Sequence, residues 1–256
     1  MQPIYKGGGK DRYDPASYRG IFLSNSSLKL LEGVMEARLQ SYTEKHDTPT
    51  PQKQGSRPGR QSHDAIYSFI AAVQLQKLSP QAPPSGSSPS PGASYCAFLD
   101  FTTAYPSVHR ERLALILKEC GITGKMWQLL KENSRRIRVR VLHPLIPANQ
   151  EVNIQRGLPE GSRLSPILFA ILASDLIRDL RTQFPDITMP SVPDLVWIGT
   201  IFYVDDAVLL ARSPTQLQAM LDRCQLWAEK NRLLINVSKT KVMVVYENPT
   251  IRAVRR

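Results

Sequence analysis

Three aspartates mark the part of the chain whose residue types could do chemistry. Asp205 and Asp206 are adjacent within the otherwise apolar run IFYVDDAVLL, and Asp100 ends another short apolar run, YCAFLDF. Gathered carboxylates repel each other, by about 4 kcal/mol for two charges about 4 Å apart at an effective dielectric constant of about 20, so they need a proton or a cation between them. Oxygen ligands select hard cations, and the pattern therefore predicts a site for Mg²⁺ or Mn²⁺. The other interpretation is an exposed Asp-Asp turn that binds no metal.

The elements around these aspartates must bring them together. Apolar runs on both sides of the pair predict a hairpin with Asp205 and Asp206 at its turn. Residues 95–246 read as strand, helices, strand, strand, helix, strand, the order of a ferredoxin-like split β-α-β antiparallel sheet with helices on one face. In such an α+β fold the strand that ends at Asp100 can lie beside the hairpin. Helices are predicted at 24–42, 63–78, 106–121, 125–133, 165–180 and 213–231, a loop or short hairpin at 1–20, and a hairpin joining 135–142 to 151–157.

Proline, glycine and serine divide the chain into segments. Residues 79–94 consist of Ser, Pro, Ala and Gly with one Gln, and this composition predicts a flexible insertion. Pro106 and Gly121 open and end one predicted helix, and Ser165 caps another. Residues 247–256 form a basic tail.

The charge and the cysteines limit the classes of function. A net charge of +11 favours a polyanionic partner, nucleic acid first and an anionic membrane second, although a basic soluble protein has the same balance. Three widely spaced cysteines argue against a zinc site or a disulfide framework. No apolar run is long enough to cross a membrane, and the N-terminus lacks the apolar core of a signal peptide. We therefore expect an intracellular protein, nuclear or cytoplasmic and not secreted.

Six segments carry a resemblance to a known family. FYVDDAVLLARS resembles the aspartate-pair box of reverse transcriptases, and AFLDFTTAYPSVHRERL resembles their first palm motif. QRGLPEGSRLSPILFAILASDL is similar to their glycine-turn-plus-helix motif, and NRLLINVSKTKVMVV to their lysine-bearing motif. DPASYRGIFLSNSSLKLLEGVMEARL and SRPGRQSHDAI resemble finger segments of the non-LTR, LINE-like branch. The segments occur in family order.

The resemblance implies a fold and a reaction. The fold is that of polymerase right-hand fingers and palm, with a fingers-like segment at 1–78, a palm at 95–246 and a further fingers portion within about 122–156. Because the chain stops soon after the lysine motif, we expect the thumb to be absent. The implied reaction is RNA-directed DNA synthesis, in which two Mg²⁺ ions, or Mn²⁺ in their place, assist attack of a DNA primer 3′-hydroxyl on a dNTP along an RNA template. The sequence does not determine an oligomeric state.

The resemblance also assigns roles in catalysis. Asp100, Asp205 and Asp206 are implied as catalytic carboxylates and metal ligands, with help from the backbone carbonyl of Phe101. Lys239 falls near the position of the pyrophosphate and is a candidate general acid, although an ordinary solvated lysine explains this residue equally well.

A second set of residues is implied in binding the incoming nucleotide. Tyr105 matches the aromatic residue that excludes a ribose 2′-hydroxyl, and a tyrosine packed in the core is the alternative. The glycines of the turn would let the backbone approach the nucleotide closely, and an arginine of the fingers would grip its triphosphate. The full set is Arg19, Tyr105, Gly157, Pro159, Glu160 and Gly161.

Basic residues between the motifs are candidates for contact with template and primer. Three of them alternate with apolar residues in RRIRVRVL and would share one face of a strand, either as a series of phosphate contacts or as an ordinary solvated face. The set is Arg57, Arg60, Arg136, Arg138, Arg140, Arg156 and Arg163.

The chain departs from the family pattern at three positions. Pro106 replaces an aspartate, Glu160 replaces a glutamine and Gly20 replaces a proline, and none of these removes a metal ligand. Two alternatives to the polymerase stay open. The first is a decayed retroelement fragment that only binds nucleic acid. The second is an RNA-dependent RNA polymerase palm, against which Tyr203 and Tyr105 argue.

Overall fold

The computed structural model describes residues 1–46, 48, 50–57, 59–78, 93–135, 137–142, 151–190 and 195–245. They form two compact units, one made of Met1–Thr48 and Thr103–Ile171 and the other of Pro49–Thr102 and Leu172–Arg256. The predicted insertion lies outside the described residues except for its last two positions, and Ser94 already belongs to a strand. The basic tail at 247–256 also lies outside them.

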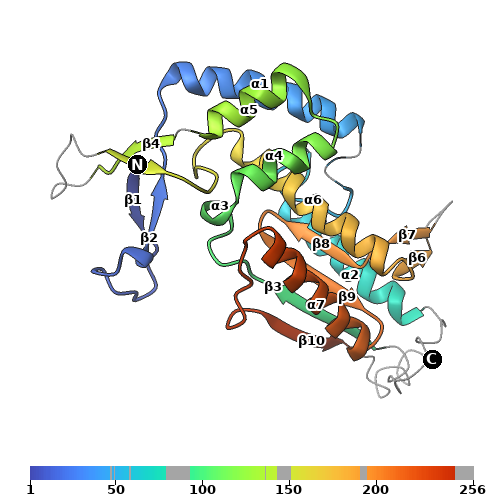
Figure 1. Cartoon of the computed structure of the whole chain (residues 1–256). Coiled ribbons are helices and arrows are strands. Elements are labelled where there is room, and N and C mark those ends of the chain that lie inside the picture. The colour runs from blue at the N-terminus through green and yellow to red at the C-terminus, as the bar shows by residue number, and fades with distance from the viewer. Residues whose placement is uncertain are drawn as a thin grey trace. The chain divides into compact units, whose positions relative to one another are not determined.

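A four-stranded antiparallel sheet organises the second unit (Figure 1). Its order is β10–β3–β9–β8, so the strand before Asp100 lies beside the hairpin, as the sequence predicted. Strands β8 and β10 are the two edges. The strands are β3 (Ser94–Leu99), β8 (Thr200–Tyr203), β9 (Asp206–Ala211) and β10 (Lys241–Val245).

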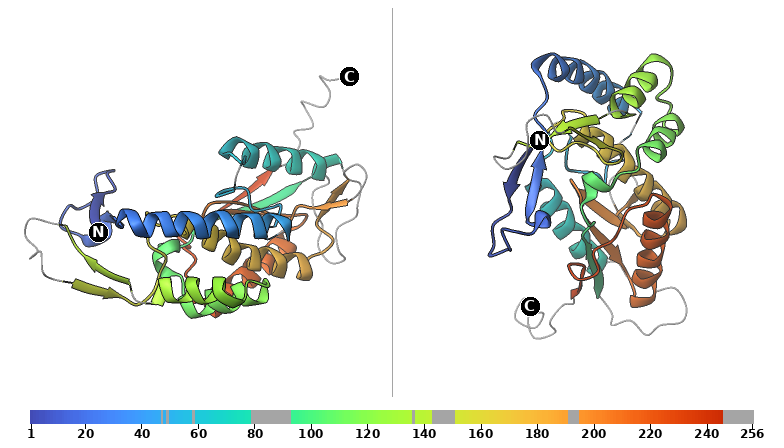
Figure 2. Two further views of the ribbon diagram at one scale, coloured as in Figure 1. Left: turned by 90° about the horizontal axis from the view of Figure 1, so that it is seen from above. Right: turned by 60° about the vertical axis from the view of Figure 1, so that its left-hand side comes forward.

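Helices cover both faces of this sheet, which corrects the expectation of helices on one face. Helix α7 (Pro214–Lys230) lies on one face and α2 (Ser62–Leu78) on the other (Figures 1 and 2). The ring of Phe101 contacts Trp227 of α7, whereas the ring of Phe98 contacts Phe69 of α2. The physical reason is that β3 and β9 are apolar at successive positions, so each face of the sheet needs cover.

The apolar segment before the aspartates is two strands rather than one. Strand β7 (Leu195–Trp197) pairs with β6 (Thr188–Pro190), and β8 starts after a break at Gly199. A Cβ atom on Gly199 would lie 2.4 Å from the ring of Trp197, so the chain turns there against its own indole. The indole nitrogen of Trp197 donates a hydrogen bond to the Phe184 carbonyl.

The first unit combines helices with two small hairpins. Strand β1 (Gln2–Tyr5) pairs with β2 (Tyr18–Ile21), with a short 3-10 turn η1 (Pro15–Ser17) before β2, and β4 (Ile137–Arg140) pairs with β5 (Glu151–Ile154). The β4–β5 hairpin was predicted, and β1–β2 is the hairpin of the two alternatives, loop or short hairpin, predicted for residues 1–20. Asn25 caps the first helix by accepting from Leu28 N. The helices are α1 (Ser26–Lys45), α3 (Ala104–Ser107), α4 (Arg110–Glu119), α5 (Gly124–Arg135) and the start of α6 (Ser165–Gln183), which ends in the second unit.

Two helix starts differ from the prediction. The single helix expected over 106–121 is the pair α3 and α4, because the chain is extended at Val108 and His109, and the His109 ring accepts from Arg112 N at 3.3 Å as a new cap. Ser165 is the first residue of α6 rather than its cap, since Leu168 N donates to Leu164 O. The Ser165 hydroxyl instead donates to the Pro159 carbonyl.

Candidate functional site

The register of the sheet brings Asp100 next to the aspartate pair. Leu99 lies opposite Ala207 in the β3–β9 ladder, so Asp100 and Asp206 follow at the same end of neighbouring strands and on the same face. The β8–β9 turn is Val204–Asp205, and Asp206 is already the first residue of β9. The backbones of Asp100 and Asp206 therefore meet at one end of neighbouring strands, with Asp205 in the turn beside them, whereas the sequence predicted both Asp205 and Asp206 at the turn. Convergence of all three carboxylates on one metal site stays a prediction.

Val204 gives the turn an unusual backbone. Its φ is +55°, the left-handed region that β-branched residues rarely occupy. Such a conformation costs on the order of 1–3 kcal/mol and persists only where the surrounding contacts impose it. The residue next to it, Asp205, is thus carried by a turn that its neighbours hold in place.

The charges at this end of the sheet influence one another. Although Asp206 is exposed as a residue, partial burial of its carboxyl raises its pKa, and the charges of Asp205 and Asp100 raise it further, while Lys239 lowers it. Lys239 Nζ lies 3.2 Å from Asp100 Oδ2. That oxygen is buried and accepts no well-aligned hydrogen bond, so the lysine acts on it as an ion pair alone.

A cavity of about 690 Å³ adjoins the aspartates. It lies between α2 and the sheet face that α2 covers, with Ile66, Phe69 and Phe98 among its apolar walls. Asp100, Asp206 and Lys239 also line it. The two carboxylates that share a sheet face therefore border an open, mainly apolar pocket.

Lys53 is a residue that the sequence prediction missed. It is fully buried in the second unit, and its Nζ donates to the Gly55 carbonyl at 3.0 Å. Burial lowers the pKa of Lys53 to about 7, while the charge of Asp205 raises it and that of Arg57 lowers it. A buried lysine under the influence of an aspartate was not recognisable within the polar stretch TPTPQKQGSRPGR.

Phe101, the implied source of a carbonyl ligand, is buried immediately after Asp100. It forms a bridge with Ile235, and its neighbours make backbone bonds to the same segment, with Asn236 N donating to Asp100 O and Thr102 N to Leu234 O. These bonds tie the end of β3 to the segment that carries Lys239, which explains how a lysine distant in sequence reaches Asp100.

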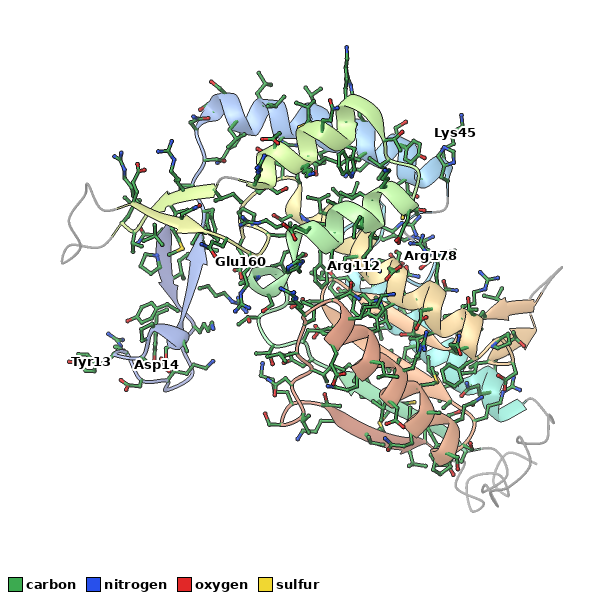
Figure 3. All side chains as sticks on the ribbon, viewed as in Figure 1. Tyr13, Asp14, Lys45, Arg112, Glu160 and Arg178 are labelled. Carbon is green, nitrogen blue, oxygen red and sulfur yellow. The ribbon has the colours of Figure 1, made fainter. Side chains whose placement is uncertain are left out.

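Backbone contacts within the first unit account for the glycine turn. Gly157 has φ +90° and a Cβ there would lie 2.4 Å from Pro106 O, and Gly161 has φ +110° with a Cβ 2.6 Å from Phe22 O. Glu160, labelled in Figure 3, accepts at its backbone carbonyl from Phe22 N. The glycines are therefore required by the packing of the turn itself.

Two further residues that the sequence prediction missed hold this turn. The guanidinium of Arg110 donates to the carbonyls of Ile154, Arg156 and Gly157, and burial lowers its pKa. Glu32 of α1 is buried, and its carboxylate accepts from the Ser162 hydroxyl and from Arg163 N. Single charged residues in helices gave no sign of this in the sequence.

Tyr105 also belongs to the first unit. Its ring is half-buried and stacks on Phe169, with centroids 4.8 Å apart and planes 22° apart. Its carbonyl accepts from Leu158 N. The stacking fits a packed tyrosine, and the exposed part of the side chain fits a residue that faces a ligand.

Most of the predicted nucleic-acid-binding arginines have partners within the protein. Arg138 and Arg140 both pair with Glu151, at 3.5 and 2.8 Å. Their side chains remain largely exposed, so these pairs can exchange for phosphate.

The other predicted arginines differ in whether they have a partner within the protein. Arg163 pairs with Glu36 at 2.9 Å, Arg57 donates to Thr50 O, and Arg60 donates to the Gln54 side chain. Arg19 on β2 and Arg156 are exposed. Arg136 lies outside the described residues.

Two negative findings apply to the described part of the chain. Within it, no group of three or more His, Cys, Asp or Glu side chains is arranged so as to hold a metal ion. Of the helices described, none is long and apolar enough to cross a membrane.

Comparisons with known proteins agree on one family. The family model described as reverse transcriptase (RNA-dependent DNA polymerase) matches residues 4–252. The probable RNA-directed DNA polymerase from transposon X-element of Drosophila melanogaster is 26% identical over 242 residues, 91% of this chain and 24% of that protein. Its counterpart from transposon BS is 27% identical over 244 residues, with the same coverage of 91% and 24%. The chain thus spans about a quarter of the length of these curated relatives.

Solved structures agree on the fold. The apo telomerase of Candida tropicalis, truncated from its C-terminal domain, superposes with a TM-score of 0.59 at 14% identity over 86% of this chain and 41% of that chain. The telomerase of the same organism with a fragment of telomeric RNA gives a TM-score of 0.58 at 12% identity over 85% of this chain and 33% of that chain. With a family model that matches nearly its whole length, and with Asp100 and Asp206 opposed at one end of neighbouring antiparallel strands, the chain belongs to the reverse transcriptase family.

Proposed function

We propose that the chain carries the nucleotidyl-transfer site of an RNA-directed DNA polymerase, in which a DNA primer 3′-hydroxyl attacks a dNTP along an RNA template. The observation that carries the proposal is the register that opposes Asp100 and Asp206, with Asp205 in the adjoining turn. The relatives named as RNA-directed DNA polymerases support the same reaction class. In this proposal the sheet that carries the aspartates belongs to the palm.

The residues present suit divalent cations. Asp100, Asp205 and Asp206 offer oxygen donors only, which is the ligand set of Mg²⁺ and Mn²⁺. Asp100 Oδ2 is buried without a well-aligned hydrogen bond, and burial together with the negative charges of Asp205 and Asp100 raises the pKa of Asp206. These carboxylates, with the Phe101 carbonyl, would hold two ions. Bound there, the ions would supply activation of the primer hydroxyl and charge stabilisation at the departing pyrophosphate.

The chain's own side chains would orient the reactants. Lys239, now paired with Asp100, would turn toward the pyrophosphate and protonate it. Tyr105 would stand against the sugar, and the glycine turn would support the base pair. The exposed arginines of the β4–β5 hairpin would hold phosphates of template or primer.

The decisive experiment is primer extension on an RNA template with Mg²⁺, comparing dNTPs with rNTPs. We expect addition of dNTPs by the chain, either alone or extended by the following segment of a relative, and no addition by the Asp205→Asn variant. Absence of synthesis from both forms, with primer–template binding intact, would refute the proposal.

Discrimination against ribose tests Tyr105 within the same assay. Tyr105→Ala should raise rNTP use relative to dNTP use, while Tyr105→Phe, which keeps the ring on Phe169, should preserve the ratio. A ratio unchanged by Tyr105→Ala, together with a loss of stability, would identify a packing residue instead.

One observation favours a second candidate function, nucleic-acid binding without synthesis. In the described residues the carboxylates are near one another but are not closed around a point that could hold a metal. Mn²⁺ titration followed by calorimetry separates the candidates, since the polymerase requires saturable binding that Asp205→Asn abolishes.

A further inference from the structure

The segment 50–57 closes the outer edge of strand β8. Lys53 forms a parallel bridge with Phe202, where Gln54 N donates to Phe202 O at 2.8 Å and Phe202 N donates to Gln52 O at 2.9 Å. Thr50 N is in turn held by the Ser174 hydroxyl at 3.1 Å. An edge strand that would otherwise end in solvent is therefore fixed three residues before Asp205.

Gly55 brings the same segment against the turn itself. A Cβ at this position would lie 2.2 Å from Val204 N and 3.0 Å from the Tyr203 carbonyl carbon. The carbonyl of Gly55 accepts from Lys53 Nζ. The Lys53 ammonium is thus hydrogen-bonded to the residue whose backbone packs against Val204, the residue with positive φ.

Two charged side chains of the described chain influence the Lys53 ammonium. Asp205 attracts the ammonium, and Arg57, whose guanidinium donates to Thr50 O, repels it. A fully buried lysine is unfavourable unless it is hydrogen-bonded and faces an opposite charge. The Gly55 carbonyl meets the first condition, and Asp205 supplies the opposite charge.

We propose that Lys53 is the positioning residue of Asp205: its buried ammonium joins the Gly55 carbonyl to the field of the Asp205 carboxylate and so holds the β8–β9 turn in one conformation. The proposal deepens the polymerase assignment and rests on it only for the chemical role of Asp205. Lys53 touches no reactant in this scheme and acts through the aspartate.

Hydrogen exchange of the full chain, without metal or nucleic acid, tests the proposal directly. Lys53→Met keeps the apolar stem and removes the ammonium. We expect exchange at the Gln54 and Phe202 amides to become about tenfold faster, with β3 and β9 unchanged. The thermal midpoint should hold or rise, because an apolar side chain replaces a buried charge. Unchanged exchange at both amides would overturn the proposal.

A double-mutant comparison separates charge coupling from a merely structural lysine. Asp205→Asn alone should speed exchange at the same two amides, and adding it to Lys53→Met should produce no further increase. Additive increases would assign Lys53 a packing role and refute the coupling. If Lys53→Met does not fold, Asp205→Asn alone decides, since unchanged exchange in that variant is incompatible with the proposal.

Lys6→Met is the matched control. Lys6 Nζ also donates to a backbone carbonyl, that of Ala16, but it is exposed and belongs to the other unit. The Lys6→Met variant should leave the exchange rates of the Gln54 and Phe202 amides as they are in the parent chain.

Kinetics give an independent measurement. In a chain that extends a primer, Lys53→Met should lower kcat about tenfold with KM for dNTP unchanged, because the aspartate rather than the nucleotide site is displaced. A raised KM at constant kcat would contradict positioning of Asp205. A parent chain that extends no primer would refute the polymerase proposal. The hydrogen-exchange experiment would still test whether Lys53 positions Asp205.

Discussion

Two hairpins of this protein carry charge in opposite ways. In β8–β9 the strands are buried, with Phe202, Leu209 and Leu210 almost inaccessible, and the carboxylates are confined to the turn and its first paired residue. In β4–β5 the strands are largely exposed, and Arg138 and Arg140 share the single carboxylate of Glu151. Fixed charges suit chemistry that needs defined geometry, whereas exposed and exchangeable charges suit attraction of a polyanion.

The largest effect should come from the charge of the buried hairpin. Asp205→Asn keeps the size of the side chain and removes one negative charge, so nucleotide addition should fall by about a thousandfold or more. Primer–template binding should be equal or slightly tighter, because repulsion of phosphate decreases. Single-nucleotide incorporation and fluorescence anisotropy measure the two quantities. Equal losses of nucleotide incorporation and of primer–template binding would show that the two hairpins do not have separate roles.

Gly55→Ala should disturb the geometry of the same hairpin without changing its charge. The added Cβ would meet Val204 N at 2.2 Å, and we expect a loss of about 1–3 kcal/mol in the free energy of unfolding, read from urea denaturation. Gly33→Ala is the opposite control, since in α1 its Cβ meets only the Arg163 side chain, at 3.4 Å, and alanine favours a helix by about 0.5–1 kcal/mol. Equal stability of the two variants would contradict the close contact at Gly55.

Neutralising the arginines of the exposed hairpin should weaken primer–template binding without slowing nucleotide addition. Arg138→Gln with Arg140→Gln should weaken primer–template binding and lower the log–log salt slope by roughly one unit per lost phosphate contact. The maximal rate at saturating primer–template should stay near that of the parent. A constant salt slope would remove these arginines from the interface.

Glu151→Gln should have the smallest effect and the opposite sign. It removes the carboxylate that both arginines share, so they become more available to phosphate and binding should tighten by a few-fold at low salt, with the gain vanishing at high salt. Weaker binding in anisotropy titrations would mean that Glu151 orients the arginines rather than competing for them.

The sequence predicted the buried hairpin well because its signal is local. Apolar residues on both sides of Asp205 specify two strands, and the short run before Asp100 specifies a third. Only a few sheet topologies connect three such strands, and in the observed one Asp100 lies opposite Asp206. The family resemblance added the reaction, and the family match confirms the membership.

Features that depend on contacts between distant segments of the chain could not be predicted from the sequence. The break between α3 and α4 is supported by Gly157 N, which donates to Val108 O, and by Leu158 N, which donates to Tyr105 O, and no periodicity within 106–121 reports such bonds. Lys53 reads as a solvated residue because its neighbours are polar, although it is fully buried. The second face of the sheet is covered by α2. The sequence did not reveal this because the predicted insertion separates α2 from the first strand of the sheet.

The unequal edges of the sheet have a consequence for handling the protein. Strand β8 is closed by the segment 50–57, whereas β10 pairs only with β3 in the described chain and exposes Val242 and Val244 at 60% and 45%. An open, apolar edge strand is a template on which a further strand adds, and neither charge nor proline interrupts VMVV to prevent it. Self-association should therefore begin at β10 and rise with concentration, and a single Val244→Lys change on that strand should raise the solubility limit of the purified chain.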